Sequence, residues 1–205
     1  MVEVLQYGYG YYKIKRRSLM GTRTNFSLRN SRNAQIGLHE LCTHIVNQIG
    51  ENITGIEIGV FSGISTVIFA SHFKLMYAVD MWQSNYDPTG IDYASDPKLY
   101  NMQEVEAHFD KIRAQANGRI VKIKKSSKEA SKDFEDNFFD FIYIDANHSY
   151  EHVQEDIALW LPKAKSFICG HDYHSKHHKG VQKAVNEIFQ VPTKTFKDSS
   201  WLVQL

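Results

Sequence analysis

The stretch Gly55–Ser65 (GIEIGVFSGIS) constrains the fold of this chain more than any other segment. An apolar run rich in isoleucine ends in a loop of small residues, and the loop opens onto Thr66–Ala70, which has the composition of a buried helix. A strand, a tight glycine turn and a helix in this order predict the first βα unit of a nucleotide-binding sheet. The backbone N–H groups at the start of such a helix offer a binding surface to a ligand.

The spacing of the glycines narrows the choice of ligand. In the dinucleotide fingerprint Gly-x-Gly-x-x-Gly the second glycine lets the backbone approach a pyrophosphate, and here that position holds the bulky Phe61. No Gly-Lys-Ser/Thr of a phosphate-binding loop follows. The loop instead reads Glu-x-Gly-x-x-x-Gly-x-Ser, with Glu57, Gly59, Gly63 and Ser65. A carboxylate at Glu57 would repel phosphate, but it can hold an ammonium group.

Acidic residues follow three further apolar segments. Lys74–Asp80 ends in Asp80, about 20 residues after the first glycine, where such folds carry a ribose-binding carboxylate. Phe138–Ile144 is nearly all apolar, as expected of a central parallel strand, and it is followed by Asp145. Ser166–Cys169, a further predicted strand, is followed by Gly170-His171-Asp172-Tyr173. Because ligands in open α/β sheets sit beyond the carboxyl ends of the strands, we expect these acids to converge.

In order and spacing, these motifs resemble the class I S-adenosylmethionine-dependent methyltransferases. They are most similar to the small-molecule and sugar O-methyltransferase branch, which has an Asp-x-x-His-x-Tyr segment, here Asp145–Tyr150. The resemblance covers roughly residues 35–205. It implies an α/β, Rossmann-like fold with a mostly parallel seven-stranded sheet, flanking helices and a C-terminal antiparallel hairpin.

The resemblance also implies a cofactor and a set of site residues. S-adenosylmethionine would be held by Glu57, Gly59, Gly63, Ser65, Asp80 and Ser127, with Ser127 near the adenine. His148 would be the general base and Asp145 would act on the acceptor beside it, because transfer to a hydroxyl requires removal of its proton. Each role has a simpler alternative: a helix cap for Asp145 or Ser127, and a solvated loop residue for His148.

A divalent cation could sit among Asp145, His171 and Asp172. The metal-dependent members of the resembled family carry acids at all three positions, and this chain has His171 in place of one. One fewer negative charge weakens Mg²⁺ binding and favours Mn²⁺, Zn²⁺ or no metal. A second group, His171, His174, His177 and His178, matches no closed zinc pattern, so we interpret it as a hydrophilic loop on the substrate side.

Periodicity predicts the remaining elements. Helices are expected near residues 31–50, 64–73, 99–117, 126–130, 150–161 and 180–189, and strands near 54–60, 75–81, 119–124, 138–144 and 166–169. Residues 193–197 and 201–205 are typical of a hairpin, and residues 2–12 could pair as a strand that Gly8 and Gly10 weaken. The irregular segment Trp82–Lys98 is either a mobile lid over the substrate or a plain surface loop.

Composition sets the class of the chain. Its 205 residues fit one domain, with 24 Lys and Arg against 23 Asp and Glu, so the net charge implies no general nucleic-acid binding. Residues 1–30 form a basic N-terminal extension before a domain over 31–205. The extension is either solvated or contacts an acidic partner or subunit of a homo-oligomer.

Two cysteines in apolar surroundings predict reduced, buried thiols and a cytoplasmic location. No apolar run is long enough for a membrane span.

The sequence therefore predicts transfer of a methyl group from S-adenosylmethionine to a hydroxyl of a small molecule such as a sugar, with general-base and metal assistance. An N- or C-directed enzyme, a nucleic-acid methyltransferase and a non-catalytic cofactor-binding member of the fold stay open as alternatives. The Asn/Asp-Pro-Pro-Tyr/Phe motif of amino-directed enzymes does not occur in the chain. Phe61 argues against an oxidoreductase.

Overall fold

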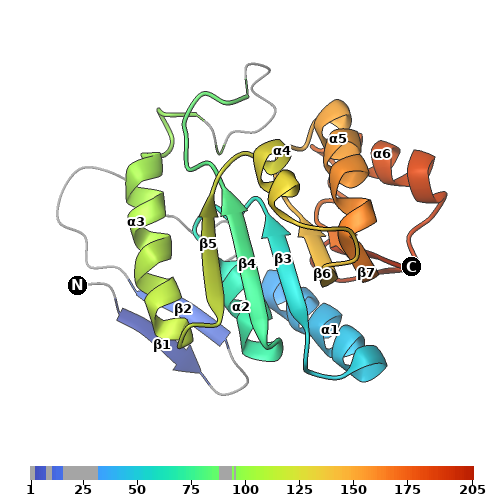
Figure 1. The fold of residues 1–205 in the computed structure, drawn as a ribbon. Helices are drawn as coiled ribbons and strands as arrows, with labels where there is room; N and C mark the ends of the chain where they lie inside the picture. Colours follow the sequence, from blue (N-terminus) through green and yellow to red (C-terminus); the bar gives the residue numbers. More distant parts are fainter. Residues whose placement is uncertain (1–2, 8–10, 16–31, 88–93, 95) are drawn as a thin grey trace.

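The computed structural model describes residues 3–7, 11–15, 32–87, 94 and 96–205. Its centre is a seven-stranded sheet with the order β5-β4-β3-β6-β7-β9-β8 (Figure 1). The strands are β3 (Thr54–Ile58), β4 (Leu75–Asp80), β5 (Ile120–Lys124), β6 (Phe139–Ile144), β7 (Ala164–Gly170), β8 (Lys194–Thr195) and β9 (Trp201–Gln204). The strands β3 to β7 are parallel, and β9 is antiparallel to both β7 and β8. The predicted fold, including its C-terminal hairpin, is confirmed.

Six α-helices of the described residues cover the two faces of the sheet. They are α1 (Arg32–Ile49), α2 (Ile64–His72), α3 (Met102–Arg113), α4 (Ser127–Ala130), α5 (Tyr150–Trp160) and α6 (Lys179–Phe189). In the view of Figure 1, α1 and α2 lie behind the sheet and α5 lies in front of it. Short 3₁₀ turns follow α3, α4 and α5 at Ala114–Ala116, Ser131–Asp133 and Leu161–Lys163.

Successive side chains of a strand point to opposite faces of the sheet, so each face has its own hydrophobic core. In β6, Phe141 and Tyr143 belong to the core under α1, α2 and α3, whereas Ile142 and Ile144 belong to the core under α5 and α6. All four side chains are at most 5% exposed. A parallel strand covered on both faces must be apolar throughout, which explains the continuous apolar run at this position.

The first described residues form a separate hairpin. The strands β1 (Glu3–Tyr7) and β2 (Tyr11–Lys15) pair antiparallel, with Tyr7 opposite Tyr11. The sequence predicted one strand over residues 2–12, weakened by Gly8 and Gly10, but the structure has two strands; the two glycines lie outside the described residues. Most of the predicted basic extension lies outside the described residues, and the division at residue 30 stays a prediction.

Buried polar groups link the C-terminal hairpin to the sheet. The Tyr143 hydroxyl on β6 lies 2.7 Å from Ser200 Oγ, and Ser200 Oγ in turn donates to Asp198 Oδ2 at 2.7 Å.

Cys42 and Cys169 are buried, free thiols as predicted, and burial raises the pKa of both. Among the helices of the described part, none combines the length and the apolar character that a membrane crossing requires.

The strand order identifies where a ligand is expected to bind, at the carboxyl ends of the central strands. Chain connections from β3 run outward to β4 and β5 on one side, and then return to β6 and β7 on the other side. The order therefore reverses between β3 and β6, and ligands of such sheets bind beyond the carboxyl ends of the strands at this point. Gly59, Asp80, Asp145 and His171 directly follow or end these strands.

Candidate active site

A cavity of about 480 Å³ opens at the carboxyl ends of β3, β4, β6 and β7, a volume in the usual range for small-ligand sites. Residues of α4 and of one side of α5 complete its wall. Residues on the wall include Ile58, Gly59, Val60, Phe61, Ser65, Asp80, Ser127, Ala146, His148, Asp156, Leu159, His171, Asp172 and His178. Asp145 also lies on it, so most of the predicted site residues converge here.

Two glycines make the loop between β3 and α2 possible. Gly59 has φ +87°, and a Cβ atom there would lie 2.2 Å from the backbone oxygen of Asp145. Gly63 has φ +82°, and a Cβ atom there would lie 2.4 Å from the ring of Phe109 on α3. L-residues rarely adopt this conformation. Gly59 lies on the cavity wall, but Gly63 lies behind it and faces α3, so its placement does not support the predicted direct contact with a cofactor.

Glu57 also lies behind the cavity wall. Its side chain is 0% exposed, and its carboxylate accepts hydrogen bonds from the hydroxyls of Ser65 and Thr66 in the first turn of α2. A buried carboxylate needs such donors, because an unpaired charge away from water is costly. Glu57 therefore anchors the start of α2. The predicted contact with an ammonium group is not supported by this placement.

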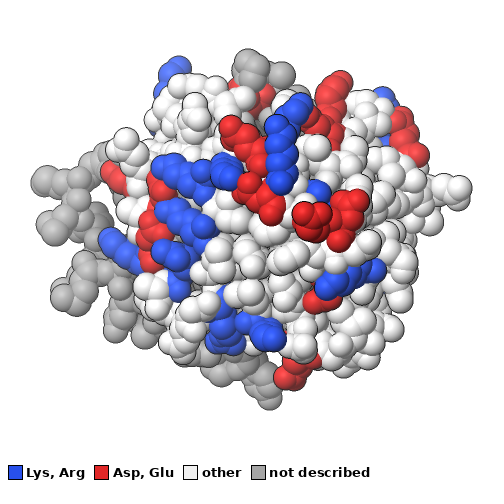
Figure 2. Space-filling model, viewed as in Figure 1, with Lys and Arg blue, Asp and Glu red and all other residues white. Residues whose placement is uncertain are grey.

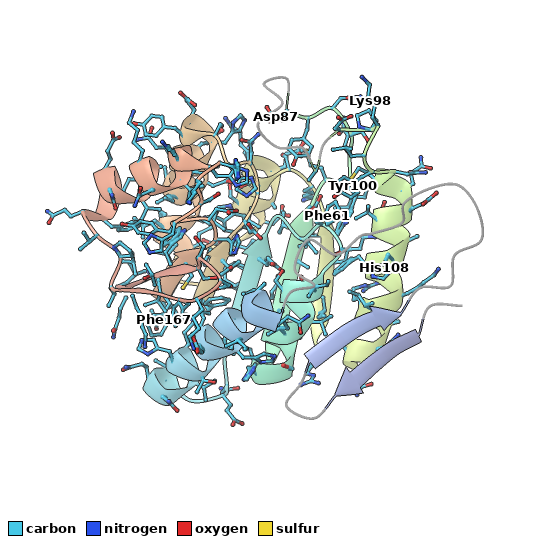
Figure 3. The ribbon with its side chains drawn as sticks, turned by 180° about the vertical axis from the view of Figure 1, so that it is seen from behind. Phe61, Asp87, Lys98, Tyr100, His108 and Phe167 are labelled. Atoms are coloured by element: carbon cyan, nitrogen blue, oxygen red, sulfur yellow. The ribbon has the colours of Figure 1, made fainter. Side chains whose placement is uncertain are left out.

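Asp80 holds two loops together at the cavity wall. Its Oδ2 accepts from the backbone N–H groups of Val60 and Phe61 at 3.0 and 2.8 Å, and its Oδ1 accepts from Trp82 N–H at 2.7 Å. Phe61 has a positive φ of 51°, and its ring packs edge-on against Tyr100 at 5.0 Å between centroids (Figure 3). Asp80 thus shapes the glycine loop in addition to facing the cavity.

The predicted adenine end of the cavity contains a short chain of side-chain contacts. The N-cap of α4 is Ser126, which forms a capping box with Glu129, so Ser127 is not the cap. Instead Ser127 Oγ donates to Asp156 Oδ1 on α5 and accepts from Trp160 Nε1 at 2.9 Å. Asp156 is 6% exposed. Burial raises the pKa of Asp156 to about 7, although the Ser127 hydrogen bond opposes this shift.

At the other end of the cavity, two aspartates and three histidines cluster. His148 Nε2 lies 3.0 Å from Asp172 Oδ2 and 3.6 Å from Asp145 Oδ1. His171 Nδ1 also lies 3.0 Å from Asp172 Oδ2. The His178 ring stacks on His148 with 4.1 Å between centroids. Ser149, not Asp145, caps α5, and only 16% of the His148 side chain is exposed, so both simpler alternatives for these residues are wrong.

The two carboxylates control protonation in this cluster. Burial disfavours the charged imidazole, but hydrogen bonds and charges from Asp145 and Asp172 outweigh burial and raise the pKa of His148 to about 10. Burial would raise the pKa of Asp172, but hydrogen bonds from His148 and His171 hold it well below its usual range. At neutral pH His148 therefore carries a proton between two carboxylates. It cannot accept a second one in this arrangement.

The donor set fits a divalent cation. Asp145, His171 and Asp172 offer ligand atoms within 4.8 Å of one another, and so do His148, Asp172 and His178. His148 Nδ1 is buried and has no hydrogen-bond partner among the described residues. A mixture of imidazole and carboxylate ligands suits Mn²⁺, Fe²⁺ or Zn²⁺ better than Mg²⁺. The predicted metal ligands therefore come together, and His178 joins them.

The family of the chain follows from a sequence comparison. A family model described as a methyltransferase domain matches residues 56–173, which is more than half of the chain. This chain belongs to the methyltransferase-domain family. The matched range begins in β3 and ends just beyond Asp172, so it contains most of the glycine loop together with Asp80, Asp145 and Asp172.

Solved structures share the fold of this methyltransferase domain. One is the O-methyltransferase TomG of Streptomyces achromogenes in complex with S-adenosylmethionine, with a TM-score of 0.56, 12% identity, and 87% of this chain and 81% of that chain covered. Another is a precorrin-6y C5,15-methyltransferase of Geobacter metallireducens, with a TM-score of 0.51, 10% identity, and coverage of 82% and 75%. Identities this low show a common fold and leave the methyl acceptor open.

A sequence relative adds little about the acceptor. An uncharacterized protein of Sinorhizobium fredii, y4gI, is 26% identical over 133 residues. The match covers 60% of the methyltransferase-domain chain but only 13% of the relative's own length.

Two residues of the methyltransferase domain's cavity were missed from the sequence. His178 was grouped with a hydrophilic loop, but the structure brings it to the cluster while His174 and His177 lie off the wall. Asp156 lies between Val153 and Trp160 on the buried face of α5. An acid in a row of apolar positions is a signal that could have identified it.

In the segment Trp82–Lys98, which was predicted to be either a lid or a surface loop, Tyr86 and Ala94 line the cavity. Residues 88–93 and 95 of this segment lie outside the described residues.

Proposed function

We propose that this protein transfers a methyl group from S-adenosylmethionine to a hydroxyl group of a small molecule, with a sugar as the leading class of acceptor. The observation that carries the proposal is the convergence, in one cavity, of the glycine loop and a cluster of two aspartates and three histidines. The loop supplies a cofactor surface and the cluster supplies groups that bind and deprotonate a hydroxyl. The sulfonium donor is already activated, so alignment and exclusion of water do most of the remaining work.

The cofactor would lie along the middle of the cavity. Gly59 lets the backbone approach the ligand, Ser65 lies at the helix start, and Asp80 faces the ribose. Ser127 lies at the opposite end from the cluster, where the adenine would sit. Glu57 and Gly63 support this arrangement from behind, through Ser65 and Phe109 respectively.

The acceptor would lie against Asp145, His148 and Asp172. His148 becomes a base only when positive charge offsets the two carboxylates that hold its proton. A divalent cation held by Asp145, His171 and Asp172 would supply that charge and lower the pKa of an acceptor hydroxyl. His178 stacks on His148 and keeps its ring in the plane that faces Asp172. Asp172 has a positive φ of 61°, a conformation that costs energy and is common at functional sites.

The distribution of surface charge bears on whether the methyl acceptor is a nucleic acid. On the face shown in Figure 2, Lys and Arg lie beside Asp and Glu over α3 and β5, and Lys122 and Lys124 both pair with Glu106. On this face of the described residues, such neutralised charge gives no continuous basic surface for a nucleic acid. Carbon or nitrogen acceptors remain compatible with the fold. A cluster that holds and moves protons favours a hydroxyl over both of them.

The test is a methyl-transfer screen with S-adenosylmethionine, a panel of sugar and other hydroxyl acceptors, and Mn²⁺, Mg²⁺ or Zn²⁺. The expected result is cation-dependent turnover that a chelator abolishes and that His148→Gln strongly reduces. His174→Gln, which changes a histidine outside the cavity wall, is the matched control and should keep wild-type turnover. Absence of S-adenosylmethionine binding by calorimetry would overturn the proposal, and chelator-resistant turnover would remove the cation from it.

A further inference from the structure

The cavity contains one buried carboxyl group that the proposed reaction does not use. Asp156 lies on α5 at the opposite end of the cavity from the histidine and aspartate cluster, and it is 6% exposed. Ser127 Oγ is bonded to its Oδ1. Its second oxygen, Oδ2, has no hydrogen-bond partner among the described residues, and Asp156 belongs to the cavity wall. The side chain is thus nearly buried, and its second oxygen is available to a donor group of a ligand in the cavity.

The surroundings hold this carboxyl group in one orientation. Trp160 Nε1, one turn further along α5, donates to Ser127 Oγ at 2.9 Å, which leaves the Ser127 hydroxyl hydrogen directed to Asp156. Leu159 also lies on the cavity wall and, three residues from Asp156, on the same face of α5. The neighbouring acid Glu155 also lines the cavity, but it pairs with Lys128 at 2.8 Å, and both side chains are exposed. Asp156 is therefore a hydrogen-bond acceptor with a fixed orientation, and it lies beside the apolar side chain of Leu159.

The chemistry of the cofactor identifies the matching donor, in an inference that rests on the proposed function. The reactive methyl group must face the cluster of Asp145 and His148, and the ribose faces Asp80, so the nucleobase points toward Ser127 and Asp156. The cofactor's own carboxylate is excluded from this end by like charge. The exocyclic amine of the adenine is then the donor left for Asp156 Oδ2, with the flat ring against Leu159.

We propose that Asp156 determines the specificity for adenine by accepting a hydrogen bond from its exocyclic amine, and that Ser127 and Trp160 position Asp156 for this contact. An analogue with hypoxanthine in place of adenine carries an oxygen where the amine was. That oxygen would face the carboxyl oxygen of Asp156 without a hydrogen between them. A site built to pair one polar group rejects a ligand that lacks it, because the buried partner is then unsatisfied.

The experiment compares S-adenosylhomocysteine with S-inosylhomocysteine by calorimetry on the full chain at pH 8, where Asp156 is ionised because the pH lies above its pKa of about 7. The wild type is expected to bind the adenine compound at least about tenfold more tightly, the range for a lost hydrogen bond to a charged group. Asp156→Leu should bind both compounds with nearly equal affinity. Asp156→Asn, which keeps the shape of the side chain, covers the case in which the leucine variant does not fold, and should also show a reduced preference. Glu151→Gln, which changes an exposed acid of α5 outside the cavity wall, is the matched control and should keep the full preference.

The outcomes separate the two proposals. Asp156 would lose its proposed role if the preference for the adenine compound survived in Asp156→Leu or Asp156→Asn. A variant that lost affinity for both compounds by the same factor would also overturn it, because a purely structural role gives that result. Binding of both compounds by the wild type without preference would also overturn it, while the proposed cofactor site would stand. Failure of the wild type to bind either compound would overturn the proposed function and this inference together.

Discussion

Asp156 makes a prediction about stability that is independent of any ligand. Its side chain is buried, and burial raises the pKa of Asp156 to about 7 in the folded protein, compared with about 3.9 for an aspartate in an unfolded chain. The folded state therefore binds more protons than the unfolded state between about pH 4 and pH 7. The free energy of unfolding must fall as the pH rises through that window.

The magnitude follows from the difference between the two pKa values. Three pKa units correspond to about 4 kcal/mol, an upper value because local relaxation and water entry reduce the cost of the buried charge. Asp156→Asn removes the charge and keeps the shape. The variant should match the wild type near pH 4 and become more stable with rising pH, by up to about 1.4 kcal/mol per pH unit, until the difference levels off above pH 7.

The assay is urea unfolding of both proteins between pH 4 and pH 8, followed by circular dichroism. Subtraction of the two curves removes the titration of all other groups, which the proteins share. Glu151→Gln, which changes an exposed acid of the same helix, is the control and should show no comparable change with pH over this window. A difference between wild type and Asp156→Asn that is independent of pH would refute the account of Asp156 as a buried, weakly compensated carboxyl group.

Three further predictions concern other residues. Asp80→Ala should weaken S-adenosylhomocysteine binding by at least about 1.5–3 kcal/mol and also lower the melting temperature, because Asp80 orders the backbone at Val60 and Phe61; unchanged affinity in calorimetry would contradict its placement. His148→Gln should reduce turnover by about 10²-fold or more and leave S-adenosylhomocysteine affinity unchanged; wild-type rates in a methyl-transfer assay would remove His148 from the chemistry. Tyr143→Phe should cost about 1 kcal/mol of unfolding free energy in urea, because it removes the buried contact with Ser200; equal midpoints would show that this contact adds nothing.

The arrangement of Asp80 changes how its variants should be interpreted. From the sequence, loss of affinity in Asp80→Ala would indicate lost hydrogen bonds to the ribose. In the structure the same carboxylate binds three backbone N–H groups of two loops. The affinity loss would then combine a lost contact with a disordered loop, and the melting temperature separates these effects.

Much of the fold was readable from the sequence, because local rules act on it directly. The helix-periodic and continuously apolar segments gave the right elements, and the order of strands and helices gave a mostly parallel sheet with a final hairpin. The glycine loop and Asp80 were placed correctly at the cavity because strand ends in such a sheet share one edge. The N-terminal hairpin was missed, because a glycine pattern in sequence does not distinguish one weakened strand from two paired strands.

The site could be predicted only where residues directly follow strands. Asp145, His171 and Asp172 lie at such positions, and they come together. Spacing alone could not distinguish wall residues from supporting ones, so Glu57 and Gly63 were predicted to touch a ligand although they lie behind the wall. Side-chain direction depends on which helix packs against the loop, and that is a tertiary fact.

The sequence by itself determined the α/β sheet, the glycine loop and the rejection of a pyrophosphate ligand, because sterics at Phe61 and hydrophobic periodicity act within a few residues. Only the tertiary structure decided the protonation of the site. His148 is an ordinary histidine in sequence, and two carboxylates from different segments raise its pKa to about 10. Asp156 is an ordinary acid in sequence, and packing of α5 against Ser127 buries it. Charges are strengthened or penalised by neighbours and by distance from water, and folding alone sets both.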